Sequence, residues 1–288
     1  MIIAISGATG FVGTHLSAYL RDRGTEIIPI PRELFAAEER QTLVGVVSQC
    51  DAVINLAGAP LDKRWTAAYR REIYESRIGT THAIVEAINS LRTKPRLFIS
   101  ASAVGYYPSS GCYAESDAKK GEGFLSDLCR DWEAEAARVS PDVRCVIARF
   151  ATVLSWDGGA FPKIASPARH RIAIRFGSGM QNFSWIDLHD LLRAVEFVMT
   201  HPAIRGPVNM VSPRRINQGQ FTRALAHRFR SWLILPLPGV LLRMIRGGAS
   251  QLILSGQCAY PEKLLAHGFT FRSHGIRDFL SQPREKEK

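Results

Sequence analysis

The chain has 288 residues, of which 46% are hydrophobic and 22% charged, as in an ordinary globular protein with a full core. Its 37 Lys and Arg residues against 26 Asp and Glu residues give a net charge of +11, which could attract nucleic acid or an anionic ligand. The basic residues are dispersed and no recognisable nucleic-acid-binding module accompanies them, so nucleic acid is not an expected partner.

Five scattered cysteines form no Cys-x-x-Cys pair. This argues against a zinc site and a disulfide framework and favours a reducing, cytoplasmic location without a metal. The chain begins with a strand, so we expect no signal peptide. Trp232 to Ile245 is the most apolar later stretch, but it is too short to span a membrane and Pro236, Pro238 and Arg243 interrupt it. We interpret it as buried core and expect no membrane partner.

The first thirteen residues organise the chain. Residues 1–5 are an unbroken apolar run, typical of a strand buried on both faces, and Gly7, Gly10 and Gly13 follow it. Gly7 and Gly10 would let the backbone turn tightly against a pyrophosphate, and Gly13 would let the next helix pack closely on the sheet. Helix N-terminal N–H groups would then face the phosphates. The strand–turn–helix context favours a dinucleotide site over a glycine turn without a ligand.

The second strand, Glu26 to Ile30, ends before Pro31 and Arg32. Arg32 lies where a dinucleotide-binding unit places the residue that reads the ribose, and an arginine there suits a 2′-phosphate, so NADP is favoured over NAD. Glu33 follows directly and weakens this reading. Pro29 is awkward in a central strand, which needs its N–H. Only residues 33–49 separate this strand from the next one, expected at 52–56. The further strand that a dinucleotide-binding fold usually has between them is therefore short or missing.

Strands and helices then alternate. Further strands are expected at 52–56, 97–102, 143–150 and 208–211, and helices at 66–91, 124–139 and 188–200. This order predicts an α/β fold with a doubly wound parallel (Rossmann) sheet and a smaller, mixed C-terminal substrate lobe. We assign residues 1–155 to the NADP-binding domain, to which residues 185–212 return. Residues 156–184 and 213–282 form the lobe, and 283–288 a disordered tail.

Four features in order carry a resemblance to a known family: Gly7-Ala-Thr-Gly-Phe-Val-Gly13, Asn55-Leu-Ala-Gly58, Ser102-Ala-Val-Gly-Tyr-Tyr107 and Trp132-Glu133. Together they resemble the extended short-chain dehydrogenase/reductases. More narrowly, the chain is similar to their atypical NAD-dependent epimerase-like, sugar-nucleotide-epimerase-related group. Pro261 to Phe271 also matches the C-terminal domain of unknown function of that group, so the resemblance spans nearly the whole chain.

The resemblance implies a set of cofactor-binding residues. Thr9, Gly10, Phe11 and Val12 would surround the pyrophosphate, Pro31 and Arg32 would take the adenosine ribose phosphate, and Leu56 and Ala57 would lie beside the cofactor. Glu72, Arg77 and Val153 match further cofactor-contacting positions. For Glu72 and Arg77 the alternative is a solvated pair on a helix.

The catalytic pattern of the group is incomplete here. Related enzymes combine a Ser or Thr with Tyr-x-x-x-Lys, in which the tyrosine is the general base. Ser102 occupies the serine position. Aligning Glu133 with the glutamate that commonly follows the lysine places Leu125 at the tyrosine and Cys129 at the lysine, and neither can replace them.

Tyr106, Tyr107 and Tyr113 are candidate substitutes for the missing tyrosine. Tyr106 is favoured because it follows Ser102 on the same loop. Without a neighbouring lysine, the reaction should be slow at neutral pH and faster in alkali. The alternative is that Tyr106 and Tyr107 only pack under the cofactor.

Two functional hypotheses stay open. The first is an NADP-dependent oxidoreductase or epimerase acting on a small polar substrate, with a nucleotide-linked one as a candidate. The second is a non-catalytic NADP-binding redox sensor or partner-binding module, which accounts for the lost Tyr–Lys pair. A third and weaker hypothesis is nucleic-acid binding through the basic surface. A homodimer is compatible with the sequence.

Overall fold

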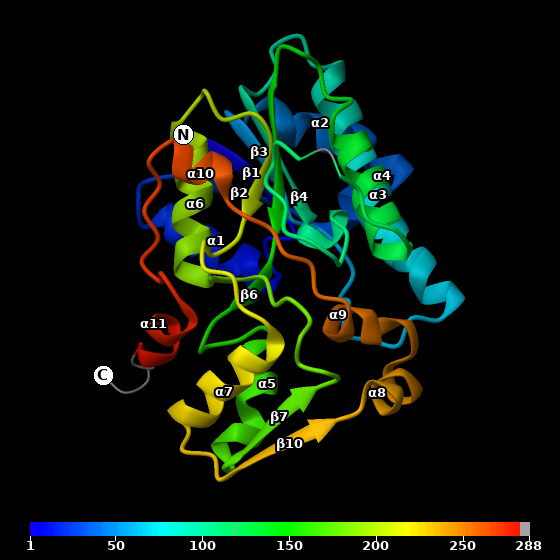
Figure 1. Ribbon diagram of the computed structural model, residues 1–288. Helices are drawn as coiled ribbons and strands as arrows, with labels where there is room; N and C mark the ends of the chain where they lie inside the picture. Colours follow the sequence, from blue (N-terminus) through cyan, green and yellow to red (C-terminus); the bar gives the residue numbers. More distant parts are fainter. Residues whose placement is uncertain (118, 283–288) are drawn as a thin grey trace.

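The fold is built on a six-stranded parallel sheet in the order β2-β1-β3-β4-β5-β9 (Figure 1). The computed structural model describes residues 1–117 and 119–282, so the tail predicted at 283–288 lies outside the described residues. The six strands are β1 (Ile2–Ser6), β2 (Glu26–Ile30), β3 (Ala52–Asn55), β4 (Leu97–Ala103), β5 (Arg144–Phe150) and β9 (Gly206–Met210). The predicted fold class is confirmed, and β9 shows the later part of the chain returning to the sheet.

Helices cover both faces of the sheet, as the apolar strands require. One face packs against α1 (Phe11–Arg21), α6 (Leu188–Thr200) and α10 (Glu262–Ala266). The other packs against α2 (Arg40–Ser48), α3 (Ala67–Ser90) and α4 (Phe124–Ala136). Thr66 begins α3 because its side chain accepts a hydrogen bond from the Tyr69 N–H. The result is a three-layer domain with two buried cores.

The edge strand β2 explains two features that are unusual in a sequence of this type. Pro29 pairs in register with Ile5 of β1, and β2 has no second neighbour, so the missing N–H faces away from the sheet. Between β2 and β3 the described chain forms only the short helices η1 (Arg32–Phe35) and η2 (Ala37–Glu39) and then α2. The sheet therefore ends at β2 without the usual further strand.

A smaller lobe lies below the carboxyl ends of the sheet strands (Figure 1). Its two-stranded parallel sheet pairs β7 (Ile172–Phe176) with β10 (Leu233–Leu237). The helices α5 (Phe161–Arg169), α7 (Gln218–Arg228) and α11 (Ile276–Ser281) share a third core with β7. A second short pair, β6 (Thr152–Leu154) with β8 (Trp185–Asp187), connects the lobe to the main domain. The remaining elements are η3 (Val104–Tyr106), α8 (Gly239–Arg246), η4 (Gly247–Ser250) and α9 (Gln251–Leu254).

Part of the stretch expected in the lobe packs elsewhere. Leu264, Phe269 and Phe271 belong to the core under α1 and α6, on the face of the main sheet. Two buried carboxylates hold this returning segment. Asp190 accepts hydrogen bonds from the Arg272 and Ser273 N–H groups, and Asp187 accepts one from the Ser273 hydroxyl. The C-terminal segment thus crosses from the lobe back to the larger domain.

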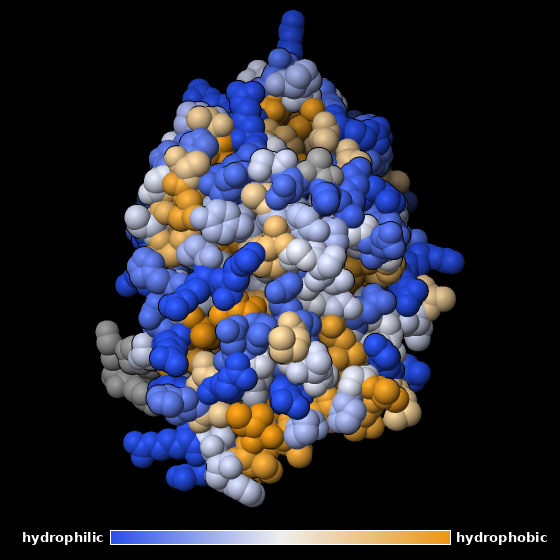
Figure 2. Space-filling view, in the orientation of Figure 1, coloured by the Kyte–Doolittle hydropathy of each residue, from blue (hydrophilic) through white to orange (hydrophobic). Residues whose placement is uncertain are grey.

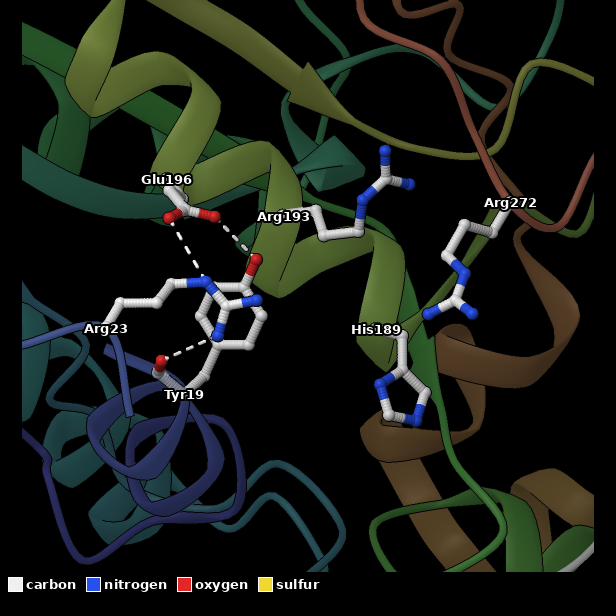
Figure 3. A pocket seen from close by; sticks show the side chains of 6 residues that line it. All are labelled: Tyr19, Arg23, His189, Arg193, Glu196 and Arg272. Carbon is white, nitrogen blue, oxygen red and sulfur yellow. Dashed lines mark hydrogen bonds and ion pairs between the residues drawn. The ribbon is translucent and has the colours of Figure 1, made fainter. Parts of the chain in front are cut away.

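The seam between α1 and α6 is polar at the surface (Figure 3). Glu196 accepts a hydrogen bond from the Tyr19 hydroxyl at 2.5 Å and pairs with Arg23. Burial, followed by the contact with Glu196, raises the pKa of Tyr19 to about 12. His189, Arg193 and Arg272 line the other side of a pocket of about 490 Å³. These contacts join the two helices beside the main core.

Two expectations from the sequence are wrong. Cys112 and Cys258 form a disulfide, although no cysteine spacing indicated one, because the fold brings residues 146 positions apart into contact. The stretch from Trp232 to Ile245 is not buried core: Trp232 is 74% exposed, and Leu242 is its one buried large apolar side chain. No helix among residues 1–117 and 119–282 is long and apolar enough to cross a membrane.

Candidate functional site

The glycine turn connects β1 to α1 at the carboxyl edge of the sheet. Gly7 has φ of +68°, and a Cβ there would lie 2.8 Å from the carbonyl group of Leu56. A Cβ at Gly13 would lie only 2.1 Å from the Gly7 oxygen. Both positions therefore require glycine, one for its backbone conformation and one for close helix packing. The predicted turn, strand and helix are all present.

The N-terminus of α1 is open to an anion. Gly10 is the N-cap, so no side chain bonds the first helical N–H groups, and the first turn holds no acidic residue. Thr9 and Gly10 are exposed at this end, with Phe11 and Val12 half-buried beside them. An uncapped helix N-terminus behind a glycine turn fits the pyrophosphate of a dinucleotide, because its N–H groups and dipole favour negative charge.

Pro31 and Arg32 directly follow β2, whose last residue Ile30 is in register with Ser6 before the glycine turn. Pro31 caps the short helix η1, which begins at Arg32 directly after the edge strand β2. Arg32 is exposed and forms no ion pair with any residue that the structure describes, so its charge is available. Glu33 is equally exposed on the same turn. The choice between a 2′-phosphate and a 2′-hydroxyl stays a prediction.

Leu56 and Ala57 follow β3, one strand away from the glycine turn. Leu56 is half-buried against the main core, and its carbonyl group abuts Gly7. Behind this loop lies Arg77, buried on α3, whose guanidinium donates to the carbonyl oxygens of Ile73 and Ala59. Burial lowers the pKa of Arg77, and no carboxylate among the described residues pairs with it.

Arg77 and Glu72 therefore do not act as a pair. A Cβ at Gly58 would lie 2.8 Å from the Arg77 guanidinium carbon, so the arginine packs directly under the loop that ends β3. Glu72 is exposed on the same helix. The interpretation of these residues as a solvated helix pair is wrong for Arg77. Direct cofactor contact stays a prediction for both residues.

A buried polar chain joins the strand ends to the helices. Ser6 donates to the Asn55 side-chain oxygen at 2.5 Å, and the Asn55 amide donates to Thr81 at 2.8 Å. The Trp132 indole donates to the same Thr81 oxygen. Sequence reasoning missed Ser6 and Thr81 as support for the site. The signal was a polar last residue in each of two otherwise apolar strands, Ser6 in β1 and Asn55 in β3.

Ser102 lies in β4 next to an ion pair that sequence reasoning also missed. Its hydroxyl donates to Glu133 Oε1 at 2.7 Å. Arg149, its register partner on β5, donates to both oxygens of Glu133, at 2.8 and 2.7 Å. All three side chains are buried. The charged hydrogen bonds with Glu133 counteract the effect of burial and raise the pKa of Arg149. Ser102 is held in place, with its proton directed at Glu133.

The three candidate tyrosines have different surroundings. The Tyr107 hydroxyl accepts from Arg149 and donates to Asn209, and burial raises its pKa. Tyr113 stacks on the Tyr107 ring. Tyr106 lies in η3 with the Arg149 guanidinium 3.7 Å from its ring centre. Tyr106 and Tyr107 are both buried, at 8% and 1% exposure, and the Tyr107 hydroxyl is in addition engaged by Arg149 and Asn209. Tyr106 is the candidate that lies closest in sequence to Ser102.

Cys129 occupies the position expected for the lysine and cannot replace it. The thiol is buried, and desolvation raises its pKa to about 12, so it stays neutral. Gly105 packs against both Cys129 and Leu125, with its hypothetical Cβ 3.7 Å from each side chain. The expected tyrosine and lysine are therefore replaced by Leu125 and Cys129, which pack under η3.

Val153 and Phe11 close the lower side of the site. Val153 lies in β6 and packs against the main core together with Phe11. The Phe11 ring fills the space above Gly158 and Gly159, where a Cβ at either position would lie 2.8 Å from a ring carbon. The structure thus brings Phe11 from the glycine turn and the start of the lobe into direct contact.

The buried ion pair gives a stability prediction. Glu133→Ala should lower the free energy of unfolding by about 3–5 kcal/mol, because Arg149 would stay buried without a counter-charge. Asp127→Ala on the same helix removes an exposed pair with Arg130 and should cost about 1 kcal/mol or less. Urea denaturation of both variants measures the difference, and equal losses would contradict the role of the buried pair.

Comparisons with known proteins agree with this geometry. The model of the NAD dependent epimerase/dehydratase family matches residues 3–217, and a domain of unknown function, DUF1731, matches residues 237–282. An epimerase family protein of Staphylococcus haemolyticus is 36% identical, with 95% of each chain covered. The crystal structure of human epimerase family protein SDR39U1 with NADPH superposes with a TM-score of 0.89 at 28% identity, covering 97% of this chain and 98% of the human one.

More distant structures share the fold alone. The structure of MoeE5 with UDP-glucose and NAD reaches a TM-score of 0.76 at 18% identity, covering 98% of this chain and 96% of the other. The family match and the identity to the staphylococcal relative both extend over the glycine turn and the carboxyl edge of the sheet. The resemblance noted in the sequence is therefore confirmed, and the chain belongs to the NAD dependent epimerase/dehydratase family.

Proposed function

We propose that the protein is an NADP-dependent oxidoreductase or epimerase that acts on a small polar substrate, with a nucleotide-linked compound as the candidate class. The observation that supports it most is the uncapped N-terminus of α1 behind the Gly7–Gly13 turn. The human relative whose structure contains NADPH supports the choice of cofactor. When bound, the cofactor would supply or accept a hydride, and the chain would orient the reacting group.

Ser102 and Tyr106 would be the residues of the protein that take part in the reaction. Ser102 keeps oxygen lone pairs for a donor group of the substrate while its own proton goes to Glu133. Tyr106 would supply or take the proton of the reacting oxygen. Arg149 would hold the Tyr106 ring in place through its guanidinium. Both residues lie at the carboxyl end of β4, where ligands bind in open α/β sheets.

A second function is favoured by one observation. The Ser102 hydroxyl is already engaged by Glu133, and Cys129 is a neutral, buried thiol where a lysine is expected. A protein that binds NADP without turnover, as a redox sensor or partner-binding module, does not need a free serine hydroxyl or an ionisable lysine at these two positions. Hydride transfer to any substrate of a screened set separates the two functions.

We place the protein in the cytoplasm, as a homodimer, as part of the same proposal. The disulfide between Cys112 and Cys258 makes this location testable. Alkylation of the protein in intact cells, before any reductant is added, should find both thiols free in a reducing cytoplasm. Protected thiols there would contradict the location, and a monomer in analytical ultracentrifugation would contradict the homodimer.

Arg32 gives a prediction on cofactor choice. A charge-assisted contact to the 2′-phosphate is worth about 1.5–3 kcal/mol, so Arg32→Ala should weaken NADPH binding at least tenfold and leave NADH binding unchanged. Arg21→Ala removes an exposed arginine from the opposite end of α1 and serves as the matched control. Calorimetric titration of both cofactors measures the affinities. Equal wild-type affinities for NADPH and NADH would contradict the assignment.

Gly10 gives a prediction on the phosphate cradle. Gly10 has φ of −74°, and a Cβ there would lie 3.2 Å from the Gly7 oxygen, so Gly10→Val should fold if the turn shifts by a few tenths of an ångström, which circular dichroism checks. Its branched side chain should abolish cofactor binding because it occupies the space of the pyrophosphate. Gly45→Val in α2, where no atom lies within 4 Å, controls for the substitution. If folded Gly10→Val still binds the cofactor, the glycine turn is not the pyrophosphate-binding site.

Catalysis gives a third prediction for this site. Tyr106→Phe should slow single-turnover hydride transfer at least about a hundredfold, the usual effect of losing a general acid or base, and Ser102→Ala should also slow it. Tyr113→Phe removes a hydroxyl from the same loop and should leave the rate unchanged. If Ser102→Ala and Tyr106→Phe both match the wild type, these residues only pack, and the non-catalytic function is favoured.

A further inference from the structure

The positive charge of the chain is concentrated in the smaller lobe. Residues 158–184 and 213–261 contain 11 of the 37 Lys and Arg residues and none of the 26 Asp and Glu residues. These stretches build β7, β10, α5, α7 and α8. The rest of the chain, with 26 basic and 26 acidic residues, is neutral. The lobe is therefore a strongly cationic body joined to an almost uncharged domain.

One face of the lobe sheet is apolar and partly exposed: Leu233 and Leu235 are exposed, and the other four apolar side chains on it are half-buried. On β7 and β10 the register pairs Ile172 with Leu233, Ile174 with Leu235, and Phe176 with Leu237, so six large apolar side chains share one face. The opposite face carries Ala173, buried against the core of α5 and α7. Parallel sheets are normally covered on both faces. Here Leu233 and Leu235 are 37% and 45% exposed.

The helix α8 continues this surface. Leu242 is buried, whereas Val240, Met244 and Ile245 are 63%, 65% and 61% exposed. Arg243 and Arg246 are exposed on the same helix. Apolar atoms lie along the lower end of the molecule in Figure 2, over β10 and α8, with hydrophilic side chains around them. We call this surface, made of the six sheet residues and α8, the basic apolar face; the exposed Trp232 directly precedes β10 at its edge.

We propose that the basic apolar face docks on a membrane surface rich in anionic lipid. Aliphatic side chains beside arginines match the interface between acyl chains and anionic headgroups, and Trp232 matches the headgroup level where tryptophan concentrates. The eight-residue helix and the short sheet would enter the interface without spanning the bilayer. This revises the expectation of no membrane partner, which depended on Trp232 to Ile245 being buried.

Two other occupants fit the surface less well. A second copy of the chain would bring two arginine-rich faces into contact, because β7, β10 and α8 contain no acidic residue, and like charges oppose that association. Nucleic acid is bound through phosphate contacts and aromatic stacking, whereas this face is aliphatic apart from Phe176 and Trp232. An anionic lipid surface satisfies both the charge and the aliphatic character.

Vesicle sedimentation tests the proposal directly. The full chain should sediment with vesicles of equal parts phosphatidylglycerol and phosphatidylcholine, and not with phosphatidylcholine alone. Binding should weaken as salt rises, because the attraction to headgroups is screened. Failure to bind the anionic vesicles, or equal binding to both kinds, would overturn the proposal. Binding of single-stranded RNA without vesicle binding would also overturn it, as would dimerisation through this face.

Trp232 reports the depth of insertion. The other four tryptophans, Trp65, Trp132, Trp156 and Trp185, are buried. Acyl chains brominated near the headgroup should therefore quench a blue-shifted Trp232 emission in bound protein. Trp232→Phe should still sediment but lose this quenching. Unquenched emission from bound wild type would show that another face makes the contact.

Variants on the basic apolar face separate the contribution of its apolar side chains from that of its arginines. Leu235→Ser combined with Met244→Ser should abolish binding, whereas Tyr74→Ser, which changes an exposed side chain on α3, should not. Arg243→Gln should weaken binding about fivefold, which corresponds to about 1 kcal/mol per basic residue at an anionic surface. Arg138→Gln, in the turn that follows α4, is the charge-matched control. Thermal unfolding at wild-type temperatures confirms that each variant folds, and unchanged binding by the face variants would refute the assignment.

Discussion

The rest of the structure depends on the close approach of α1 to the end of β1. Gly13 faces the Gly7 carbonyl oxygen at a distance that leaves no room for a side chain, and Gly7 in turn abuts the loop that ends β3. This contact fixes the direction in which α1 leaves the sheet. It also leaves the first helical N–H groups facing outward at the carboxyl edge. A fold requirement and a binding feature therefore arise from the same glycines.

The second constraint is the buried pair of Glu133 and Arg149. It connects α4 to β5 and, through further hydrogen bonds, orders Ser102 and Tyr107. Nearby, Cys129 and Leu125 pack against Gly105 at the two positions where the resemblance led us to expect a lysine and a tyrosine. The edge of β4 is thus rigid and highly ordered, but it lacks a lysine to lower the pKa of a tyrosine. A slow enzyme and a cofactor-dependent binding protein both fit such an edge.

Local sequence patterns predicted most of the larger domain. Apolar runs gave the strands, and the glycine turn gave the first crossover, because both are decided by residues close together in the chain. Pro29, which does not suit a central strand, is accommodated because β2 is the edge strand of the sheet. The resemblance added the cofactor positions, most of which lie along the carboxyl edge of the sheet, with Glu72 exposed on α3.

Features that depend on distant contacts were missed or wrong. The disulfide joins residues 146 positions apart, and the ion pair joins a helix to a strand, so no spacing revealed either. The apolar stretch from Trp232 to Ile245 has a composition typical of core residues. Only the three-dimensional structure shows that α5 and α7 cover one face of β7 and leave the opposite face, together with β10, partly exposed. Hydrophobicity alone does not distinguish a core from a partly exposed face.

A crystal structure of the protein soaked with NADPH tests the central claim most directly. We expect the pyrophosphate on the N–H groups of Phe11 and Val12, the 2′-phosphate beside Arg32, and the nicotinamide ring near Tyr106. A cofactor bound elsewhere, or no binding at saturating NADPH in a folded protein, would contradict the account.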